Sequence, residues 1–232
     1  MLLHFTFDLI AYSIGVVLML KVFKSKTEVI KDSNIQYAYY TTLIIGAFFG
    51  SFIIGSLNTL YSLDREGITI GKSVLGAIVG GVIVAEIFKK VMNIRGSTGA
   101  YFVPSLAIGI AIGRIGCFLT GIEDYTYGIE TDSFLAYDFG DGVLRHPVQL
   151  YESAVMGIFF IYTVWIYLKN RVQFERVIFY QFIFVYSTQR FVWEFLKPYE
   201  TIIFDLNIFH FFCFGLICYA IFMLNRREDM LI

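Results

Sequence analysis

Seven long apolar runs alternate with short polar segments along the chain. Each run has about 20 residues, the length that a helix needs to cross the hydrocarbon core of a bilayer. They cover residues 2–22, 37–57, 68–88, 100–119, 149–168, 177–196 and 202–224. The pattern predicts an all-α integral membrane protein with seven transmembrane helices, and we expect residues 1–232 to form a single transmembrane domain.

Composition supports a membrane protein. Hydrophobic residues make up 57% of the sequence and aromatic residues 19%, more than a soluble domain of this length carries. The formal net charge of −1 excludes the strongly basic surface of a nucleic-acid-binding protein, so the bilayer is the large partner implied. The three cysteines lie in apolar runs without metal-ligand spacing, and we expect neither a metal nor a cofactor.

Basic residues gather in alternate loops, which predicts the topology. They are Lys21, Lys24, Lys26 and Lys31 after the first run, Lys89, Lys90 and Arg95 after the third, Lys169, Arg171 and Arg176 after the fifth, and Arg226 and Arg227 in the tail. The other loops hold only Arg65, Arg145 and Lys197 as basic residues. By the positive-inside rule the N-terminus lies outside and the C-terminus in the cytoplasm.

Glycines are frequent in the third and fourth runs. They are Gly71, Gly76, Gly80 and Gly81 in the third, and Gly109, Gly113 and Gly116 in the fourth. Glycine lets helix backbones approach closely, so we expect both runs to lie centrally in the bundle. Pro104 is expected to bend the fourth run, which a membrane helix tolerates.

Three basic residues lie inside the apolar runs: Lys72, Arg114 and Arg190. A charge in hydrocarbon costs a few kcal/mol even on insertion scales, so each needs a partner or a wet cavity. In the predicted topology all three lie one or two turns below the outer surface. Gln149 and Glu152 enter the bilayer at a similar depth.

Two interpretations of these charges remain open. The first is a set of internal salt bridges, Arg190 with Glu194 at i,i+4 spacing and Arg114 with Glu152, that only hold helices together. The second is a site for a phosphate at headgroup depth, which suits the planar donors of arginine. Two arginines and a lysine against two glutamates leave a positive excess, which favours the phosphate site.

Three segments carry a resemblance to a known family. They are GRIGCF at 113–118, followed by Gly121 and Gly128, then RHPVQLYE at 145–152, and RFVWEF at 190–195. Together they resemble the signature of bacterial prolipoprotein diacylglyceryl transferases. The resemblance implies transfer of a diacylglyceryl group from phosphatidylglycerol to the lipobox cysteine thiol of a lipoprotein precursor, in the bacterial inner membrane, with release of glycerol phosphate.

The resemblance also assigns candidate site residues. Arg114 matches the family's phosphatidylglycerol-binding arginine, and Arg190 matches its second functional arginine. The remaining substrate-binding candidates are Lys72, Gly128, Gln149, Tyr151, Glu152 and Glu194.

One departure from the family concerns the general base. Family members often carry a His-Gly-Gly run in the third span, whereas this chain has Leu75-Gly76-Ala77. The thiol must lose its proton before it attacks, and His146 at the outer mouth, or Lys72, is then the candidate base. The missing histidine also motivates an alternative, a catalytically silent relative that binds or moves anionic phospholipid.

The outer loop 120–146 is the longest segment outside the apolar runs, and it is acidic. Asp141-Gly142 predicts a tight turn, and the alternating stretch 134–139 predicts one arm of a small hairpin. This loop is expected to form a flap over the lipid site that meets the peptide acceptor. The alternative is an acidic loop that is only solvated.

Overall fold

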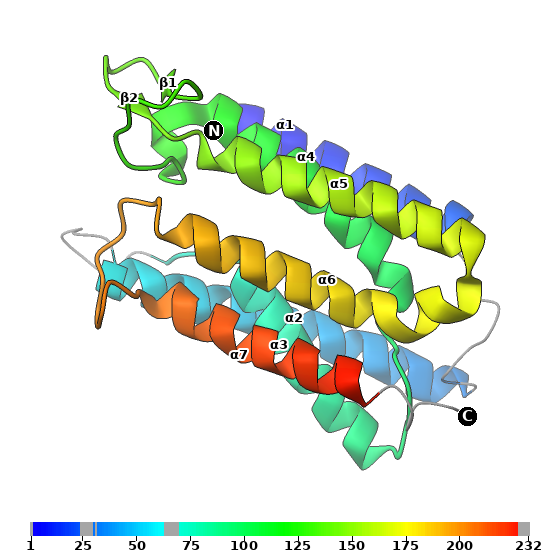
Figure 1. Ribbon diagram of the computed structural model, residues 1–232. Coiled ribbons are helices and arrows are strands. Elements are labelled where there is room, and N and C mark those ends of the chain that lie inside the picture. Colours follow the sequence, from blue (N-terminus) through cyan, green and yellow to red (C-terminus); the bar gives the residue numbers. More distant parts are fainter. Residues whose placement is uncertain (1, 24–29, 31, 63–69, 227–232) are drawn as a thin grey trace. The chain divides into compact units, whose positions relative to one another are not determined.

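The computed structural model describes residues 2–23, 30, 32–62 and 70–226, and it is almost entirely helical (Figure 1). The α-helices are α1 (Leu2–Val17), α2 (Ser33–Ser62), α3 (Val74–Val91), α4 (Val103–Thr120), α5 (Val148–Lys169), α6 (Arg171–Glu194) and α7 (Ile208–Asn225). Shorter elements are the π-helix η1 (Leu18–Val22), the 3-10 helices η2 (Ala100–Phe102) and η3 (Gly121–Asp124), and the strands β1 (Tyr137–Asp138) and β2 (Leu144–Arg145).

Five helical segments among the described residues are long and apolar enough to cross a membrane. They are Phe5–Val22, Ser33–Leu60, Ala100–Asp124, Val148–Lys169 and Ile208–Asn225, and each falls on a predicted apolar run. Helices α3 and α6 form in the other two runs but are not among the five. In α3, Glu86, Lys89 and Lys90 crowd the C-terminal half. The all-α membrane class is therefore confirmed, and the number of seven spans stays a prediction.

Part of the topology prediction rests on residues that the structure does not describe. These are Lys24, Lys26, Lys31, Arg65 and Arg227, together with residues 68 and 69 at the start of the third run. The orientation of the termini and the single transmembrane domain stay predictions.

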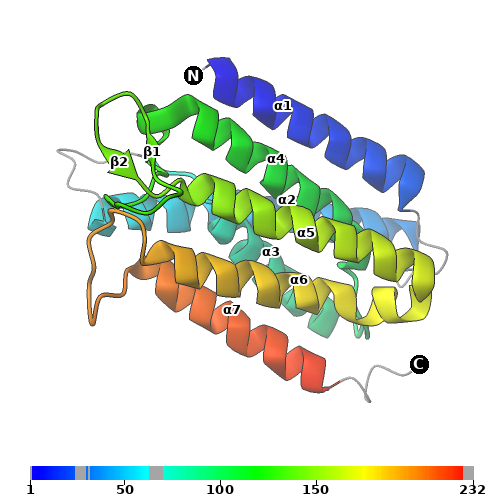
Figure 2. The same ribbon diagram turned by 45° about the horizontal axis from the view of Figure 1, so that its top comes forward.

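The chain divides into two compact units, Met1–Ser25 with Thr98–Pro198, and Lys26–Ser97 with Tyr199–Ile232. In the first unit α4 lies between α1 and α5, and α6 packs on α5 (Figures 1 and 2). The hydroxyl of Ser105 on α4 donates to the carbonyl of Gly15, and that of Ser153 on α5 donates to the carbonyl of Ala111, both over 2.8 Å. These bonds connect α1, α4 and α5, as Ser side chains often do between helices in a membrane.

In the second unit, α2 and α3 pack backbone against backbone. A Cβ added to Gly55 would lie 2.6 Å from the carbonyl carbon of Gly71, and Gly50 faces Gly76 in the same way. The predicted close approach is therefore confirmed for the third run, where Gly80 also takes part.

The fourth run lies centrally in the first unit, as predicted, because α4 packs between α1 and α5. Backbone approach at its glycines is limited: among the described residues, nothing lies within 4 Å of a Cβ at Gly109 or Gly113, and Phe7 crowds Gly116. In the third run, Gly81 likewise has no neighbour within 4 Å in that part of the chain. Pro104 does not bend a continuous helix: it lies in the first turn of α4, after η2, where its missing N–H costs nothing.

Local capping signals set the helix ends in the second unit. Ser73 Oγ accepts a hydrogen bond from Gly76 N (3.2 Å) and caps α3. At α7, Asn207 Oδ1 accepts from His210 N (3.2 Å) while Asn207 N donates to His210 Nδ1 (3.1 Å). Such caps satisfy amide groups that a helix start leaves open. Lys72 therefore precedes α3, and the expectation that it lies within a helical span was wrong.

The loop 120–146 contains the predicted hairpin. Strands β1 and β2 pair antiparallel with Tyr137 opposite Arg145, and the turn between them contains Gly142 at φ 79°. The ring of Tyr137 packs on Phe118 of α4 with centroids 4.8 Å apart. Ile129 N donates to Leu196 O over 2.7 Å. The loop is thus tied to both α4 and the segment that follows α6.

Candidate functional site

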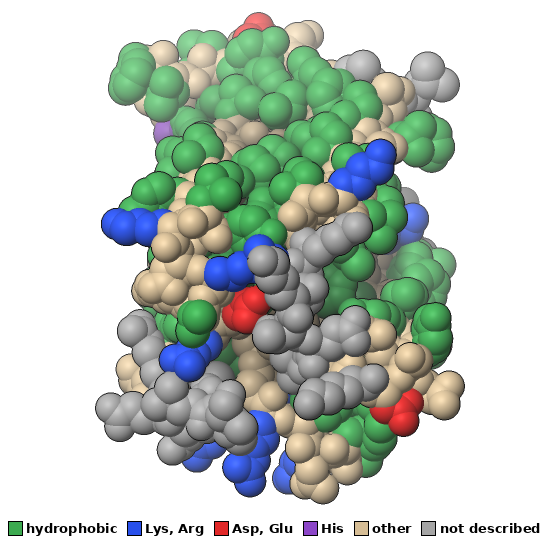
Figure 3. Space-filling view, turned by 90° about the vertical axis from the view of Figure 1, so that its right-hand side faces the viewer, with side chains coloured by type: hydrophobic (Ala, Val, Ile, Leu, Met, Phe, Trp, Pro, Cys, Tyr) green, Lys and Arg blue, Asp and Glu red, His purple; other side chains and the backbone are tan. Residues whose placement is uncertain are grey.

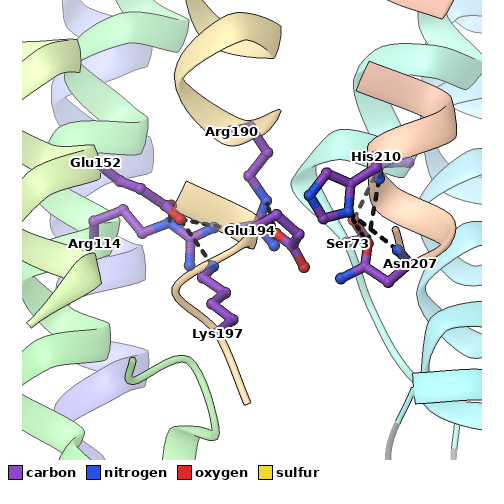
Figure 4. Close-up of polar contacts among 9 residues, drawn as sticks. Ser73, Arg114, Glu152, Arg190, Glu194, Lys197, Asn207 and His210 are labelled. Atoms are coloured by element: carbon purple, nitrogen blue, oxygen red, sulfur yellow. Dashed lines mark hydrogen bonds and ion pairs between the residues drawn. The ribbon is translucent and has the colours of Figure 1, made fainter. Parts of the chain in front are cut away.

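A buried carboxylate in the first unit holds three cations. Glu152 of α5 is 1% exposed, and its Oε1 accepts from Arg190 Nη1 over 2.7 Å and from Lys197 Nζ over 2.8 Å. Its Oε2 contacts Arg114 Nε (Figure 4). The four side chains come from α4, α5, α6 and the residues just after α6. We call them, together with Glu194, the charge cluster.

Glu194 is the second carboxylate of the charge cluster. Its Oε2 forms an ion pair with Arg190 Nε at 3.1 Å, one turn along α6, as the i,i+4 spacing predicts. Both ion pairs expected from the sequence, Arg190 with Glu194 and Arg114 with Glu152, are therefore confirmed as contacts. Three cations face two carboxylates, so the cluster keeps an excess of one positive charge.

The cations of the charge cluster differ in accessibility. The side chain of Arg114 is 12% exposed, that of Arg190 is 5% exposed and that of Lys197 is 1% exposed. Arg114 is thus the cation that an incoming anion would reach first. Arg114 contacts Glu152 through its Nε, which lies at the side of the guanidinium group.

Gln149 lies on α5, one turn before Glu152, and its side-chain amide is buried. The residue is 1% exposed, and neither Oε1 nor Nε2 has a hydrogen-bond partner in the described part of the chain. An unsatisfied buried polar group costs about 1–3 kcal/mol, and native proteins keep few of them. The amide therefore has the donor and the acceptor that a polar ligand would need.

The lysine in the charge cluster is not the one that the sequence suggested. Lys72 belongs to the second unit, where its Nζ lies 5.5 Å from the ring centre of Phe52. The sequence pattern places Lys197 in a loop between two apolar runs. A signal for it exists in the spacing: positions 190, 194 and 197 follow one face of a helix.

His146 belongs to the loop rather than to the charge cluster. Its Nδ1 lies 3.2 Å from the Tyr151 hydroxyl, and the Tyr151 ring lies 5.3 Å from the Trp193 ring. Within the described residues, no hydrogen bond or ion pair links His146 to the charge cluster. The imidazole and the phenol form a separate pair at the start of α5.

Gly128 is required for packing at the base of the loop. Its N donates to His146 O over 2.9 Å, and a Cβ at this position would lie 2.6 Å from that same oxygen and 2.8 Å from Val148 Cγ2. The glycine thus allows the loop to lie directly against the residues that lead into α5.

We expect Gly128→Ala to destabilise the loop by about 1–3 kcal/mol, since the added methyl group has no space. Limited proteolysis should then cut within 120–146 faster than in the wild type. The matched control is Gly157→Ala on α5, where nothing lies within 4 Å of the new Cβ. Equal cleavage rates for Gly128→Ala and the wild type would show that the loop tolerates the methyl group.

Comparison with known proteins gives a consistent result. The model of the prolipoprotein diacylglyceryl transferase family matches residues 6–226. A phosphatidylglycerol–prolipoprotein diacylglyceryl transferase of Geobacter sulfurreducens is 31% identical over 143 residues, 60% of this chain and 51% of that protein. Proteins of the same name from Campylobacter hominis (30% identical; 67% of this chain and 58% of that protein) and Finegoldia magna (35%; 55% and 50%) also match.

The chain spans about half the length of the curated relatives that it matches. No solved structure matches. The family match nevertheless covers four of the five candidate spans in full, all but the first residue of the other, and the whole charge cluster. This multi-pass membrane protein belongs to the prolipoprotein diacylglyceryl transferase family.

Proposed function

We propose that the protein transfers a diacylglyceryl group from phosphatidylglycerol to the lipobox cysteine thiol of a lipoprotein precursor, and that the charge cluster binds the lipid phosphate. The observation that carries the proposal is the buried Glu152, which gathers Arg114, Arg190 and Lys197 and leaves one positive charge in excess. The names of the relatives point to the same lipid and the same acceptor.

The chemistry follows from the roles that these groups can fill. The thiolate sulfur attacks the glyceryl carbon, the bond from that carbon to the phosphate oxygen breaks, and glycerol phosphate leaves with the electron pair. Guanidinium groups already in place stabilise the departing charge without reorganisation in a site with little water. Arg114, the most exposed cation, contacts the phosphate, and Glu152 fixes its position beside Arg190.

The other candidates take supporting roles in this proposal. Gln149 offers its unpaired amide to the polar headgroup, and Glu194 orients Arg190. His146, held by Tyr151, is the candidate to accept the thiol proton, and Gly128 shapes the loop that carries it. Lys72 remains a candidate for lipid binding from the second unit.

The proposed setting is the bacterial inner membrane, with seven spans, the N-terminus outside and the C-terminus in the cytoplasm. The loop 120–146 forms the flap that receives the signal peptide. Its bond from Ile129 N to Leu196 O attaches it next to Lys197, which supports a position over the phosphate site.

The experiment that tests the proposal uses purified protein, labelled phosphatidylglycerol and a lipobox peptide. A diacylglyceryl thioether on the peptide cysteine is the expected product. If the protein bound the lipid but formed no product, the proposed transferase activity would be contradicted. That result would support the alternative, a catalytically silent relative that binds or moves anionic phospholipid.

Phosphatidylglycerol binding should weaken as the pH rises through about 8. Burial lowers the pKa of the Lys197 ammonium to about 8, and the neighbouring Arg190 guanidinium adds to the effect. Above this pH the lysine is neutral and the positive excess is lost, which costs about 1 kcal/mol or roughly fivefold in affinity. A lipid-binding titration at several pH values measures the change.

The control for this titration is Lys197→Arg, because arginine stays charged over the whole range. Its affinity should not change between about pH 7 and 9. The same decline in the wild type and in the variant would assign the pH dependence to another group.

A further inference from the structure

A basic cavity of about 260 Å³ lies in the second unit, where the C-terminal ends of α3 and α7 meet. Four cations line it, Lys89, Lys90, Arg95 and Arg226. Glu86 is the only carboxylate among the described residues that line it. Lys and Arg side chains are also the prevalent charged groups on the molecular face seen in Figure 3.

An ion pair between the buried Lys89 and the partly exposed Glu86 lines this cavity. The side chain of Lys89 is 8% exposed and its Nζ lies 3.0 Å from Glu86 Oε1. The hydroxyl of Tyr219 on α7 donates to the same oxygen over 2.8 Å. The one carboxylate is therefore already used to bind Lys89 and to connect α3 with α7.

A backbone turn and a ring contact place two of the cations that line the cavity, Arg95 and Arg226. After α3 the chain turns back, with Ile94 N donating to Lys89 O over 2.8 Å and Asn93 at φ 53°. This turn brings Arg95 to the helix end beside Lys90. The guanidinium of Arg226 lies 4.5 Å from the ring centre of Phe222.

The charge balance of the cavity favours an anion. Four cations and one carboxylate sum to three positive charges. The C-terminal ends of two helices contribute roughly −0.5 each, so about two positive charges remain without compensation within the described residues. Clusters of Lys and Arg on the cytoplasmic side of membrane helices attract anionic headgroups, and the charge pattern of the sequence predicts that this end is cytoplasmic.

We infer that this cavity binds a phosphate group, that of an anionic lipid headgroup or that of a soluble phosphate ester. The lipid is favoured by the apolar side chains of Ile94 and Met223, which line the same cavity, and by Val91 at the end of α3, which is 72% exposed. The residues that line the cavity include none of the charge cluster. The inferred ligand is therefore additional to the proposed transfer reaction.

Acetylation of Lys90 in the wild-type protein tests the inference without any substitution. The protein is placed in phosphatidylcholine nanodiscs, and acetylation of each lysine is followed by mass spectrometry. Addition of phosphatidic acid to the bilayer should slow acetylation of Lys90 several-fold and leave the exposed Lys169 unchanged. Protection by added inorganic phosphate instead assigns the site to a soluble phosphate ester. No protection in either arm, or equal protection of Lys169, overturns the inference.

A charge-neutralising variant gives an independent measurement. Lys90→Gln/Arg95→Gln/Arg226→Gln should weaken binding of phosphatidic acid by about 100-fold, at the usual contribution of each basic residue near a headgroup. The control Lys21→Gln/Lys169→Gln/Arg176→Gln removes the same charge from exposed positions of the other unit, and it should retain binding. Equal losses in the two triple variants would show a general charge effect and no site.

Discussion

We expect replacement of Arg114 by alanine to slow the proposed diacylglyceryl transfer strongly and to leave the protein folded. The side chain of Arg114 is the most exposed of the three cations of the charge cluster, and loss of one such charge-stabilising donor costs about 100- to 1000-fold in rate. Folding persists because Glu152 keeps Arg190 and Lys197 as partners. The thioether assay measures the rate, and thermal unfolding in detergent measures the fold.

The matched control for this substitution is Arg176→Ala, which removes an exposed arginine from α6 in the same unit. It should transfer the diacylglyceryl group at the wild-type rate. If Arg114→Ala also retained its activity, the arginine would only connect α4 to Glu152, and the phosphate site would have to lie elsewhere.

Glu152→Ala gives the largest expected loss of stability in the molecule. It leaves three neighbouring cations, two of them nearly fully buried, with Glu194 as the one remaining carboxylate of the cluster. Removal of one member of a buried ion pair destabilises a protein by about 3–5 kcal/mol. Denaturant unfolding monitored by Trp fluorescence measures the change. Glu194→Ala should cost less, since Arg190 keeps its bond to Glu152.

A compensating variant separates charge from packing. Glu152→Gln combined with Lys197→Met removes one charge of each sign and restores the original excess of one. This double variant should recover at least about half of the stability lost in Glu152→Ala. Unfolding of Glu152→Ala within about 0.5 kcal/mol of the wild type would show that water already compensates the cations.

The sequence predicts the helices well because the bilayer imposes their length. Every apolar run contains a helix, and i,i+4 spacing alone is sufficient to pair Arg190 with Glu194. Helix ends are harder to predict, because a single side chain decides them. Ser73 begins α3 several residues inside its apolar run and so leaves Lys72 outside the helix.

Contacts that depend on tertiary structure could not be predicted. Lys197 looks like an ordinary loop lysine until the chain is seen to continue past α6 toward Glu152. Glycines are as frequent in α4 as in α3, yet Gly76 and Gly80 of α3 face the backbone of α2, whereas Gly109 and Gly113 of α4 face no other backbone among the described residues. Glycines in a sequence show that a helix can approach another helix closely, and the helix that packs against it decides whether this approach occurs.

The hydrogen bond from Ile129 to Leu196 has a thermodynamic consequence. It attaches the loop 120–146 to the residue just before Lys197, whose ammonium group contacts Glu152. A peptide that binds the loop in only one of its conformations would change the affinity of Arg114 and Arg190 for a lipid anion. Linkage requires the reverse effect to have equal size. Occupancy of the lipid site would then change how tightly the peptide is bound.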